Sequence, residues 1–288
     1  MSQEKNIFNP SSIAIAMITH YPKWYRGNMQ SIKNTDKIRG DLAIETIIKA
    51  RQQGYHVLVA DGQSSKTFRK TLSQMPELNL IKRESMKRRL ARKQVIKMAQ
   101  KLNEVKVIVE TEAEKVSLIT KCIPMITDLI LNNKADIVVP KRNLELFKKT
   151  YPNYQYESEI EGNILYNEIL KTSGFRDQKD EDLDLFFGPV AMKNTKMVVE
   201  LFLGNFGFKV DLNAKSRQFF QQDEYGFLPI VAALKNKLRV KSVEVPFEYP
   251  KTQKMNELAA VGELFREKRR NQRMSILIDL LYFVQYLK

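Results

Sequence analysis

The stretch Val105-Lys106-Val107-Ile108-Val109-Glu110-Thr111-Glu112 joins a short apolar run to two glutamates spaced two residues apart. The β-branched residues predict a strand over 105–109. Acidic residues two apart at a strand end place two carboxylates where a divalent cation and a phosphate can meet. A helix start is the alternative interpretation, because carboxylates there cap free N–H groups and oppose the helix dipole.

Similar apolar runs recur through the first half of the chain and alternate with helical stretches. Strands are predicted at 13–19, 55–60, 78–82, 105–109 and 135–139, and helices at 41–53, 85–103 and 114–131, with a short helix capped by Ser64 or Ser65. This alternation predicts an α/β fold, a sheet flanked by helices.

The second half of the chain has a less regular pattern. We predict a helix at 158–172, a strand-like run at 185–192 interrupted by Gly188-Pro189, a helix at 225–236, a strand at 239–245 and a helical C-terminus at 255–287.

Composition predicts a folded protein of the cell interior. Hydrophobic residues make up 43% of the 288 residues and charged residues 28%, which is ordinary for a globular chain. The single cysteine, Cys122, excludes an intramolecular disulfide framework and suits a reducing compartment. The N-terminus lacks the pattern of a signal peptide and no apolar run is long enough to span a membrane, so a cytoplasmic location is expected.

The formal net charge of +15 predicts an anionic partner or surface. The cations gather at 82–97 and 266–273, in two stretches with helical patterns. Two solvated helix faces are the plain interpretation, and nucleic-acid binding is a rival function because such cations release counterions from phosphates. No nucleic-acid-binding motif is present in the sequence, so a specific nucleic-acid partner is not expected.

Residues directly after the predicted strands form the candidate binding site, since ligands of open α/β sheets lie at the carboxyl ends of the strands. They combine hydroxyls, a turn with free N–H groups, carboxylates and cations, as a nucleotide-diphosphate and metal site requires. These residues are Thr19, His20 and Tyr21, then Asp61, Gly62, Ser64 and Ser65, then Glu110, Glu112 and Glu114, and then Lys141 and Arg142.

Four segments, in this order, resemble the GT-A glycosyltransferases that use nucleotide-diphosphate sugars, in particular family 2. They are Ile15-Ala16-Met17-Ile18-Thr19, Val57-Leu58-Val59-Ala60-Asp61-Gly62-Gln63-Ser64-Ser65, Ala91-Arg92-Lys93 and Val107-Ile108-Val109-Glu110-Thr111-Glu112. The resemblance covers residues 12–142 and continues more weakly through 187–189, 222–224 and 232–245.

This resemblance implies a GT-A, Rossmann-like mixed sheet with a catalytic, nucleotide-sugar-binding domain at 1–250 and a helical extension at 251–288. It also implies transfer of a sugar from a nucleotide-diphosphate donor to an acceptor that the sequence does not identify. The donor-binding residues would be Thr19, Tyr21, Asp61, Gly62, Ser64, Arg92 and Lys141.

Glu110-Thr111-Glu112 occupies the place of the family's Asp-x-Asp motif, whose carboxylates hold Mg²⁺ or Mn²⁺ against the diphosphate. Glutamates replace both aspartates, and the late histidine that supplies a third ligand in some members has no counterpart here. Weak metal binding, metal-independent transfer and a degenerate fold that only binds anionic surfaces or nucleic acid therefore stay open. A nucleotidyltransferase would open with a Gly-rich loop, where this chain has Thr19-His20-Tyr21-Pro22.

For an inverting mechanism the resemblance nominates Asp223 as the catalytic base, with Glu224 as the alternative, although both residues could instead cap a helix. Asp184, Gly188 and Pro189 are the candidate acceptor-binding residues, and a solvated acidic loop is the alternative for Asp184. Retention or inversion stays open.

The C-terminal segment joins basic residues to an apolar stripe, and it is expected either to pack on the domain or to lie on an anionic membrane surface. The stripe consists of Ile276, Leu277, Leu280, Leu281, Phe283, Val284 and Leu287.

Overall fold

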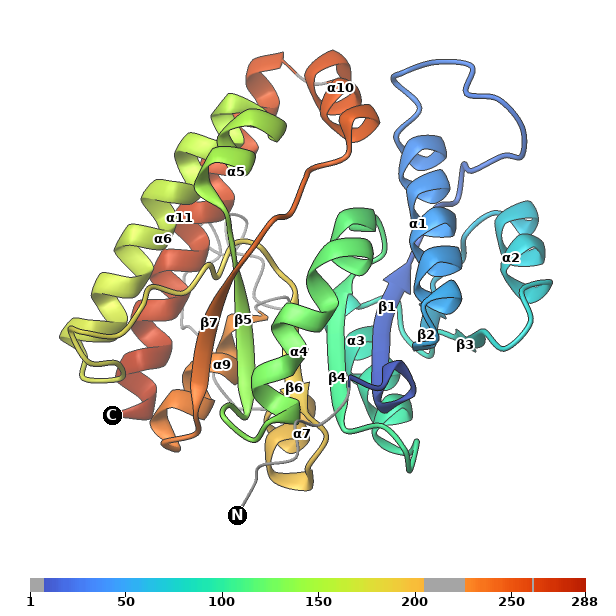
Figure 1. The fold of residues 1–288 in the computed structure, drawn as a ribbon. Helices are drawn as coiled ribbons and strands as arrows, with labels where there is room; N and C mark the ends of the chain where they lie inside the picture. The colour runs from blue at the N-terminus through green and yellow to red at the C-terminus, as the bar shows by residue number, and fades with distance from the viewer. Residues whose placement is uncertain (1–7, 205–225, 261) are drawn as a thin grey trace.

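A seven-stranded sheet with helices on both faces organises the part of the chain that the computed structural model describes, residues 8–204, 226–260 and 262–288 (Figure 1). The strands are β1 (Ile13–Thr19), β2 (His56–Asp61), β3 (Asn79–Lys82), β4 (Val107–Glu112), β5 (Ile137–Arg142), β6 (Val190–Lys193) and β7 (Val240–Val245). This arrangement confirms the predicted α/β class with a mixed sheet.

The strand order is β3-β2-β1-β4-β6-β5-β7. β6 runs antiparallel to β4 and β5, and the other pairs are parallel. The chain leaves β1 toward β2 and β3 on one side and then returns to place β4 on the other. Such a reversal opens a crevice at the carboxyl ends of the two central strands. The ends of β1 and β4 are therefore the place where the topology positions a binding site.

One face of the sheet is covered by α1 (Thr35–Gln52), α2 (Lys66–Ser73), α4 (Ile123–Leu131) and the short α5 (Leu144–Thr150). Ile15, Val57 and Val109 point to this face, because alternate residues of a strand share a side. Two short segments, η1 (Pro10–Ser12) and η2 (Leu118–Cys122), adjoin β1 and α4.

The opposite face is covered by α3 (Arg88–Gln100), α6 (Asn153–Thr172), α7 (Lys196–Leu203), α9 (Phe227–Lys235) and α11 (Gly262–Leu287). α11 runs beside α6 in Figure 1, with Leu280 and Phe283 fully buried. Four residues of the C-terminal apolar stripe, Leu277, Leu280, Phe283 and Val284, are buried against this face, whereas Leu281 is exposed. Within the described residues, no helix combines the length and apolarity that a membrane crossing requires.

The helix predicted from 114 to 131 is split. Residues 118–122 form a π-helical turn, and the α-helix begins at Ile123. Pro124 explains the split, because a proline within a continuous α-helix lacks the N–H for its bond and its ring clashes with the preceding turn. At the second position of α4 the missing N–H is harmless.

The strand-like run 185–192 is also shorter than predicted, because only Val190 onward pairs in the sheet. Gly188 has a positive φ of 94° and Pro189 has no N–H to donate, so neither residue fits a regular ladder. The helices α5 and α7 were not predicted.

The C-terminal extension begins with α10 (Lys251–Ala260), which packs against α1 above the carboxyl ends of the strands (Figure 1). Asn256 donates to the Ile32 carbonyl at 2.7 Å, and Glu257 pairs with Arg39 at 3.2 Å. Tyr249 also donates to Glu257, at 2.7 Å. α10 therefore joins the start of α1 to the end of the sheet.

Candidate functional site

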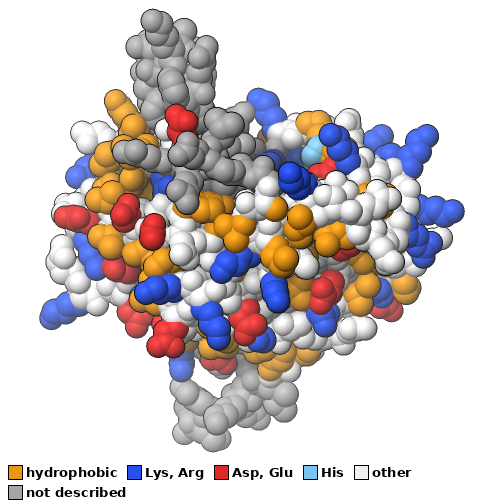
Figure 2. All heavy atoms as spheres, turned by 90° about the horizontal axis from the view of Figure 1, so that it is seen from above, with side chains coloured by type: hydrophobic (Ala, Val, Ile, Leu, Met, Phe, Trp, Pro, Cys, Tyr) orange, Lys and Arg blue, Asp and Glu red, His pale blue; other side chains and the backbone are white. Residues whose placement is uncertain are grey.

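The carboxyl edge of the sheet brings most of the predicted site residues together. β1, β2 and β4 end there, and the antiparallel β6 begins there, so that Val190 pairs with Glu110. Figure 2 shows this end of the molecule, with Lys and Arg side chains spread over it. The site therefore combines the ends of three parallel strands with the start of a fourth, antiparallel one.

The turn after β2 is tied to the end of β1 through one carboxylate. Asp61 Oδ1 accepts from Thr19 Oγ1 at 2.8 Å and from the Ser64 hydroxyl, and its Oδ2 accepts from the Ser64 N–H at 3.3 Å. The Gly62 N–H donates to the Thr19 carbonyl at 2.8 Å. Asp61 is buried, so these bonds form with little competition from water. The turn is thus a rigid, acid-centred platform at the sheet edge.

Tyr21 and Gly62 hold this turn through their backbones. The Tyr21 N–H donates to Ser64 Oγ at 2.8 Å, while its ring packs edge-on against Phe68 at 5.1 Å. Burial, followed by the nearby Glu114 carboxylate, raises the pKa of the Tyr21 hydroxyl. Gly62 lies beneath the Arg83 side chain, which a Cβ would strike. Tyr21 therefore holds the turn through its backbone while its side chain is buried, and its assignment to donor binding stays a prediction.

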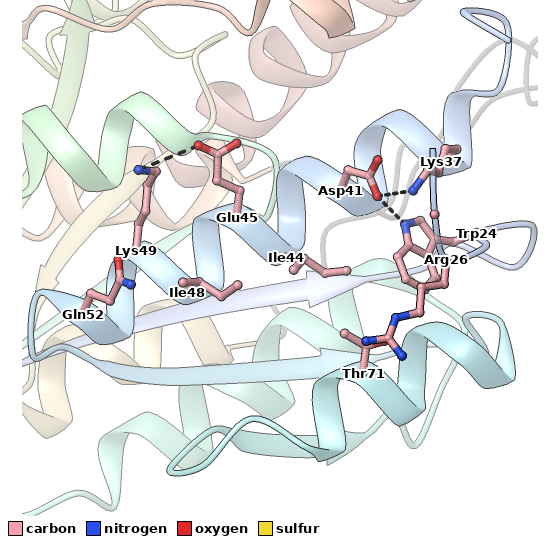
Figure 3. A pocket seen from close by; sticks show the side chains of 11 residues that line it. Trp24, Arg26, Lys37, Asp41, Ile44, Glu45, Ile48, Lys49, Gln52 and Thr71 are labelled. Atoms are coloured by element: carbon pink, nitrogen blue, oxygen red, sulfur yellow. Dashed lines mark hydrogen bonds and ion pairs between the residues drawn. The ribbon is translucent and has the colours of Figure 1, made fainter. Parts of the chain in front are cut away.

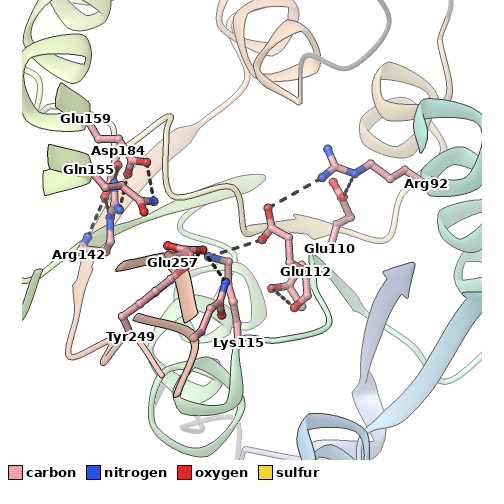
Figure 4. A network of polar contacts seen from close by, with 12 residues as sticks. Arg92, Glu110, Glu112, Lys115, Arg142, Gln155, Glu159, Asp184, Tyr249 and Glu257 are labelled. Atoms are coloured by element: carbon pink, nitrogen blue, oxygen red, sulfur yellow. Dashed lines mark hydrogen bonds and ion pairs between the residues drawn. The ribbon is translucent and has the colours of Figure 1, made fainter. Parts of the chain in front are cut away.

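Glu110 and Glu112 point to the same side of β4 and share one cation (Figure 4). Arg92 Nε lies 3.0 Å from Glu110 Oε1, and Arg92 Nη2 lies 3.9 Å from Glu112 Oε1. Lys115 Nζ approaches the other Glu112 oxygen at 3.6 Å. Arg92 belongs to α3, which packs on the side of the sheet to which Glu110 and Glu112 point, so the packing of this helix on the sheet assembles the cluster. We call Glu110, Glu112, Arg92 and Lys115 the acid–arginine cluster.

The two glutamates of the cluster have opposite pKa shifts. Burial raises the pKa of Glu110, and Arg92 offsets only part of that effect. Burial also raises the pKa of Glu112, but Lys115 and Arg92 outweigh it, so the pKa of Glu112 lies below its ordinary value. Glu112 is therefore the more strongly acidic of the pair.

Gly188 brings the segment before β6 directly against Glu112. A Cβ at this position would lie 2.5 Å from Glu112 Oε1, and the backbone has a φ of 94° that side chains rarely adopt. The predicted acceptor-side residues Gly188 and Pro189 thus lie next to the acid–arginine cluster.

We expect Gly188→Ala to displace the Glu112 carboxylate and to lower the free energy of unfolding by about 1–3 kcal/mol, the usual cost of a strained backbone. Urea denaturation measures the stability change. Gly174→Ala is the matched control, because Gly174 also has a positive φ, of 76°, but a Cβ there has no neighbour within 4 Å. A loss of stability in Gly188→Ala no larger than that in Gly174→Ala would contradict a cost from the Gly188–Glu112 contact.

Asp184, predicted to bind the acceptor, lies in the protein interior. It is buried and accepts from Arg142 Nε at 2.7 Å and Nη2 at 2.8 Å, and from Asn163 Nδ2 at 2.7 Å. Burial alone raises its pKa, but the Arg142 guanidinium outweighs that effect and lowers it. Glu159 accepts from Arg142 Nη1 at 2.7 Å. Asp184 therefore serves an interior ion-pair cluster, which corrects that prediction.

Within the residues that it describes, the structure does not place three other predicted residues, Lys141, Asp223 and Glu224, at the acid–arginine cluster. Lys141 lies at the same sheet edge but on β5, with β6 between it and β4. Asp223 and Glu224, the candidate bases, lie outside the described residues.

With its side chains in this arrangement, the acid–arginine cluster is a poor fit for a divalent ion. No group of three or more His, Cys, Asp or Glu side chains suited to a metal occurs in residues 8–204, 226–260 and 262–288. Both carboxylates of the pair already face Arg92. Mg²⁺ and Mn²⁺ prefer oxygen ligands and would have to displace that guanidinium.

A cavity adjoins the acid–arginine cluster on the α3 side. Cations from the first two turns of α3 line it together with Glu110, and apolar groups complete its wall. The lining residues are Arg88, Arg89, Arg92, Lys93, Ile96, Glu110, Phe202, Gly204, Gly226, Leu228 and Pro229. The sequence pattern predicted a basic helix at 85–103, but it did not predict that this helix packs against Glu110 and Glu112.

A larger cavity, of about 580 Å³, lies along the outer side of α1 near Trp24 (Figure 3). Asp41 there accepts from Trp24 Nε1 at 2.9 Å and from Lys37 Nζ at 2.8 Å. None of its lining residues belongs to a strand end. Of these two cavities in the described residues, the smaller is therefore the better candidate site, because it adjoins the residues that the sheet topology gathers.

No protein-family model and no curated protein matches this sequence. Among solved structures, the chain is similar to a protein from Desulfovibrio desulfuricans G20 provisionally described as a nucleotide-diphospho-sugar transferase, with 6% identity, a TM-score of 0.48, and 96% of this chain and 98% of that chain covered. It is also similar to a 4-diphosphocytidyl-2C-methyl-D-erythritol synthase from Anaerococcus prevotii DSM 20548, with 10% identity, a TM-score of 0.43, and 88% and 98% covered.

Proposed function

We propose that this protein is a glycosyltransferase that takes a sugar from a nucleotide-diphosphate donor. The observation that carries the proposal is the position of the Asp61 turn, which is hydrogen-bonded to the end of β1, beside the Glu110–Glu112 pair at the end of β4, where the strand order reverses. Ligands of open α/β sheets bind at that place. The resemblance of the same segments to GT-A glycosyltransferases supports a nucleotide sugar as the ligand.

In this proposal the two sides of the sheet edge hold different parts of the donor. The platform of Thr19, Asp61 and Ser64 receives the nucleoside, and the cations of α3 receive the diphosphate, since guanidinium groups match phosphate oxygens in geometry. The segment at Gly188 and Pro189 forms the acceptor side. Asp223 and Glu224 remain the candidates for the base that removes the acceptor proton.

A divalent ion at Glu110 and Glu112 remains a prediction from the resemblance. When bound there, it would neutralise charge on the departing nucleoside diphosphate. The two carboxylates would have to exchange Arg92 for the ion.

A thermal-shift screen of the purified protein tests the proposal. UDP-, GDP-, CDP-, ADP- and dTDP-sugars are each added with EDTA, with Mg²⁺ or with Mn²⁺, because a ligand that binds the native state raises the melting temperature. We expect a shift with the sugars of one base. Binding to RNA, DNA or anionic vesicles without a shift from any nucleotide would contradict the proposal and favour a degenerate fold that binds anionic surfaces.

A second assay follows the donor that the screen identifies. Release of the nucleoside diphosphate that depends on an added acceptor, with the sugar recovered on that acceptor, would establish transfer. Glu112→Gln is expected to abolish that release, because the variant loses the more acidic carboxylate of the pair. Full activity of Glu112→Gln would contradict its place in the site.

A further inference from the structure

The acid–arginine cluster already contains the positive charge that its carboxylates need. Glu110 and Glu112 contribute two negative charges when ionised, and Arg92 and Lys115 contribute two positive charges at distances of 3.0 to 3.9 Å. Arg92 reaches both carboxylates, the two groups that would hold a divalent ion. A guanidinium is always charged at neutral pH and cannot be removed by a chelator.

The neighbouring cavity supplies further cations on the same helix. Arg88, Arg89 and Lys93 line it in addition to Arg92, within the first six residues of α3. Lys93 donates to the Gly204 carbonyl, which orients its ammonium group at the cavity wall. Burial, with Arg89 second, lowers the pKa of Lys93, as expected where cations are crowded and an anion would relieve them.

From this arrangement we propose that the α3 cations bind the donor diphosphate directly and that Arg92 takes the place of the divalent ion, so that donor binding does not require a metal. This inference rests on the proposed function and specifies the chemistry of its diphosphate subsite. Arg89 and Lys93 are assigned as diphosphate-binding residues. Arg92 is assigned as the residue that neutralises Glu110 and Glu112 while it faces the same cavity.

Apolar groups in the lining of the cavity strengthen the electrostatic effect of these cations. Ile96, Phe202 and Leu228 line the cavity beside them. A phosphate between cations in a site with little water interacts more strongly than it does in bulk water. The cavity is thus suited to an anionic group that is at least partly removed from solvent.

Isothermal titration calorimetry of the full chain with UDP, GDP, CDP, ADP and dTDP tests the inference. Each nucleotide is titrated in EDTA and then in excess Mg²⁺ or Mn²⁺. We expect one nucleotide to bind with Kd values within about threefold of each other in all three conditions. Binding only with metal would overturn the inference and leave the proposed function standing, whereas no binding in any condition would overturn both.

A double substitution, Arg89→Gln with Lys93→Gln, tests the assigned residues. We expect at least a tenfold rise in Kd for the nucleoside diphosphate and a much smaller change for the corresponding nucleoside, which has no phosphate. The control is Lys97→Gln with Lys101→Gln, which removes the same charge from exposed positions in the last turn of α3 and directly after it. Equal losses in the two variants would show that only the general charge matters and would overturn the assignment.

Arg92→Ala tests the replacement of a metal by arginine. It leaves Glu110 and Glu112 without the cation they share, so the variant is expected to bind Mn²⁺ at least tenfold more tightly than the natural protein, measured by the electron paramagnetic resonance signal of free Mn²⁺. Arg92→Lys keeps a cation and is expected to show no such gain. Mn²⁺ binding by the natural protein as tight as that of a folded Arg92→Ala would overturn the inference.

Discussion

Replacing Arg142 by methionine is expected to lower the free energy of unfolding by about 3–5 kcal/mol, the usual cost of breaking a buried ion pair by removing one partner. Arg142 is 1% exposed and binds Asp184 with two side-chain nitrogens and Glu159 with a third. Its guanidinium carbon also lies 3.6 Å from the centre of the Phe147 ring. Urea denaturation measures the loss.

Arg239→Met is the matched control for this prediction. Arg239 also pairs with an aspartate through two nitrogens, at 2.8 and 3.0 Å from Asp136, but it is 44% exposed. A much smaller loss is expected, since water and salt screen an exposed pair. A similar loss in both variants would contradict the importance of burial.

A double variant distinguishes two causes of the stability loss in Arg142→Met, namely the lost hydrogen bonds and the buried negative charge left without a partner. Arg142→Met with Asp184→Asn removes both a cation and an anion, so it is expected to be destabilised by less than the sum of the two single variants. Additive losses would show that Arg142 and Asp184 act independently.

Asp61→Asn is expected to weaken binding of the nucleotide identified by the screen about ten- to a hundredfold. Hydrogen bonds to a charged group contribute about 1.5–3 kcal/mol each, and the amide offers one acceptor oxygen where the carboxylate offers two. Thr19 and Ser64 would lose part of the acceptor that fixes them at the sheet edge. Calorimetry at fixed metal concentration measures the change.

Asp41→Asn provides the comparison for Asp61→Asn. Asp41 also accepts from two side-chain donors, Trp24 and Lys37, but it lies on the outer side of α1. Its substitution is expected to leave nucleotide affinity unchanged. Unaltered affinity in Asp61→Asn as well would refute the nucleoside platform.

Local sequence patterns determined the first half of the fold well. The strand predicted at 13–19 matches β1, and the predicted strands at 55–60 and 78–82 match β2 and β3 within one residue at each end. Buried parallel strands consist of short β-branched runs, a signal contained within the strand itself. The short helices α5 and α7 were missed, since their seven and eight residues give too little periodicity.

The sequence by itself also determined which residues stand at the strand ends, and so the gathering of Thr19, Asp61, Glu110 and Glu112 at one edge. Only the tertiary structure decided their partners. Sequence patterns did not reveal that Arg92 bridges the two glutamates, or that Asp184 is held by Arg142 in the interior. Strand ends follow from local backbone preferences. An ion pair between distant residues depends instead on how the elements that carry them pack together, and that packing is determined by many side chains far apart in the chain.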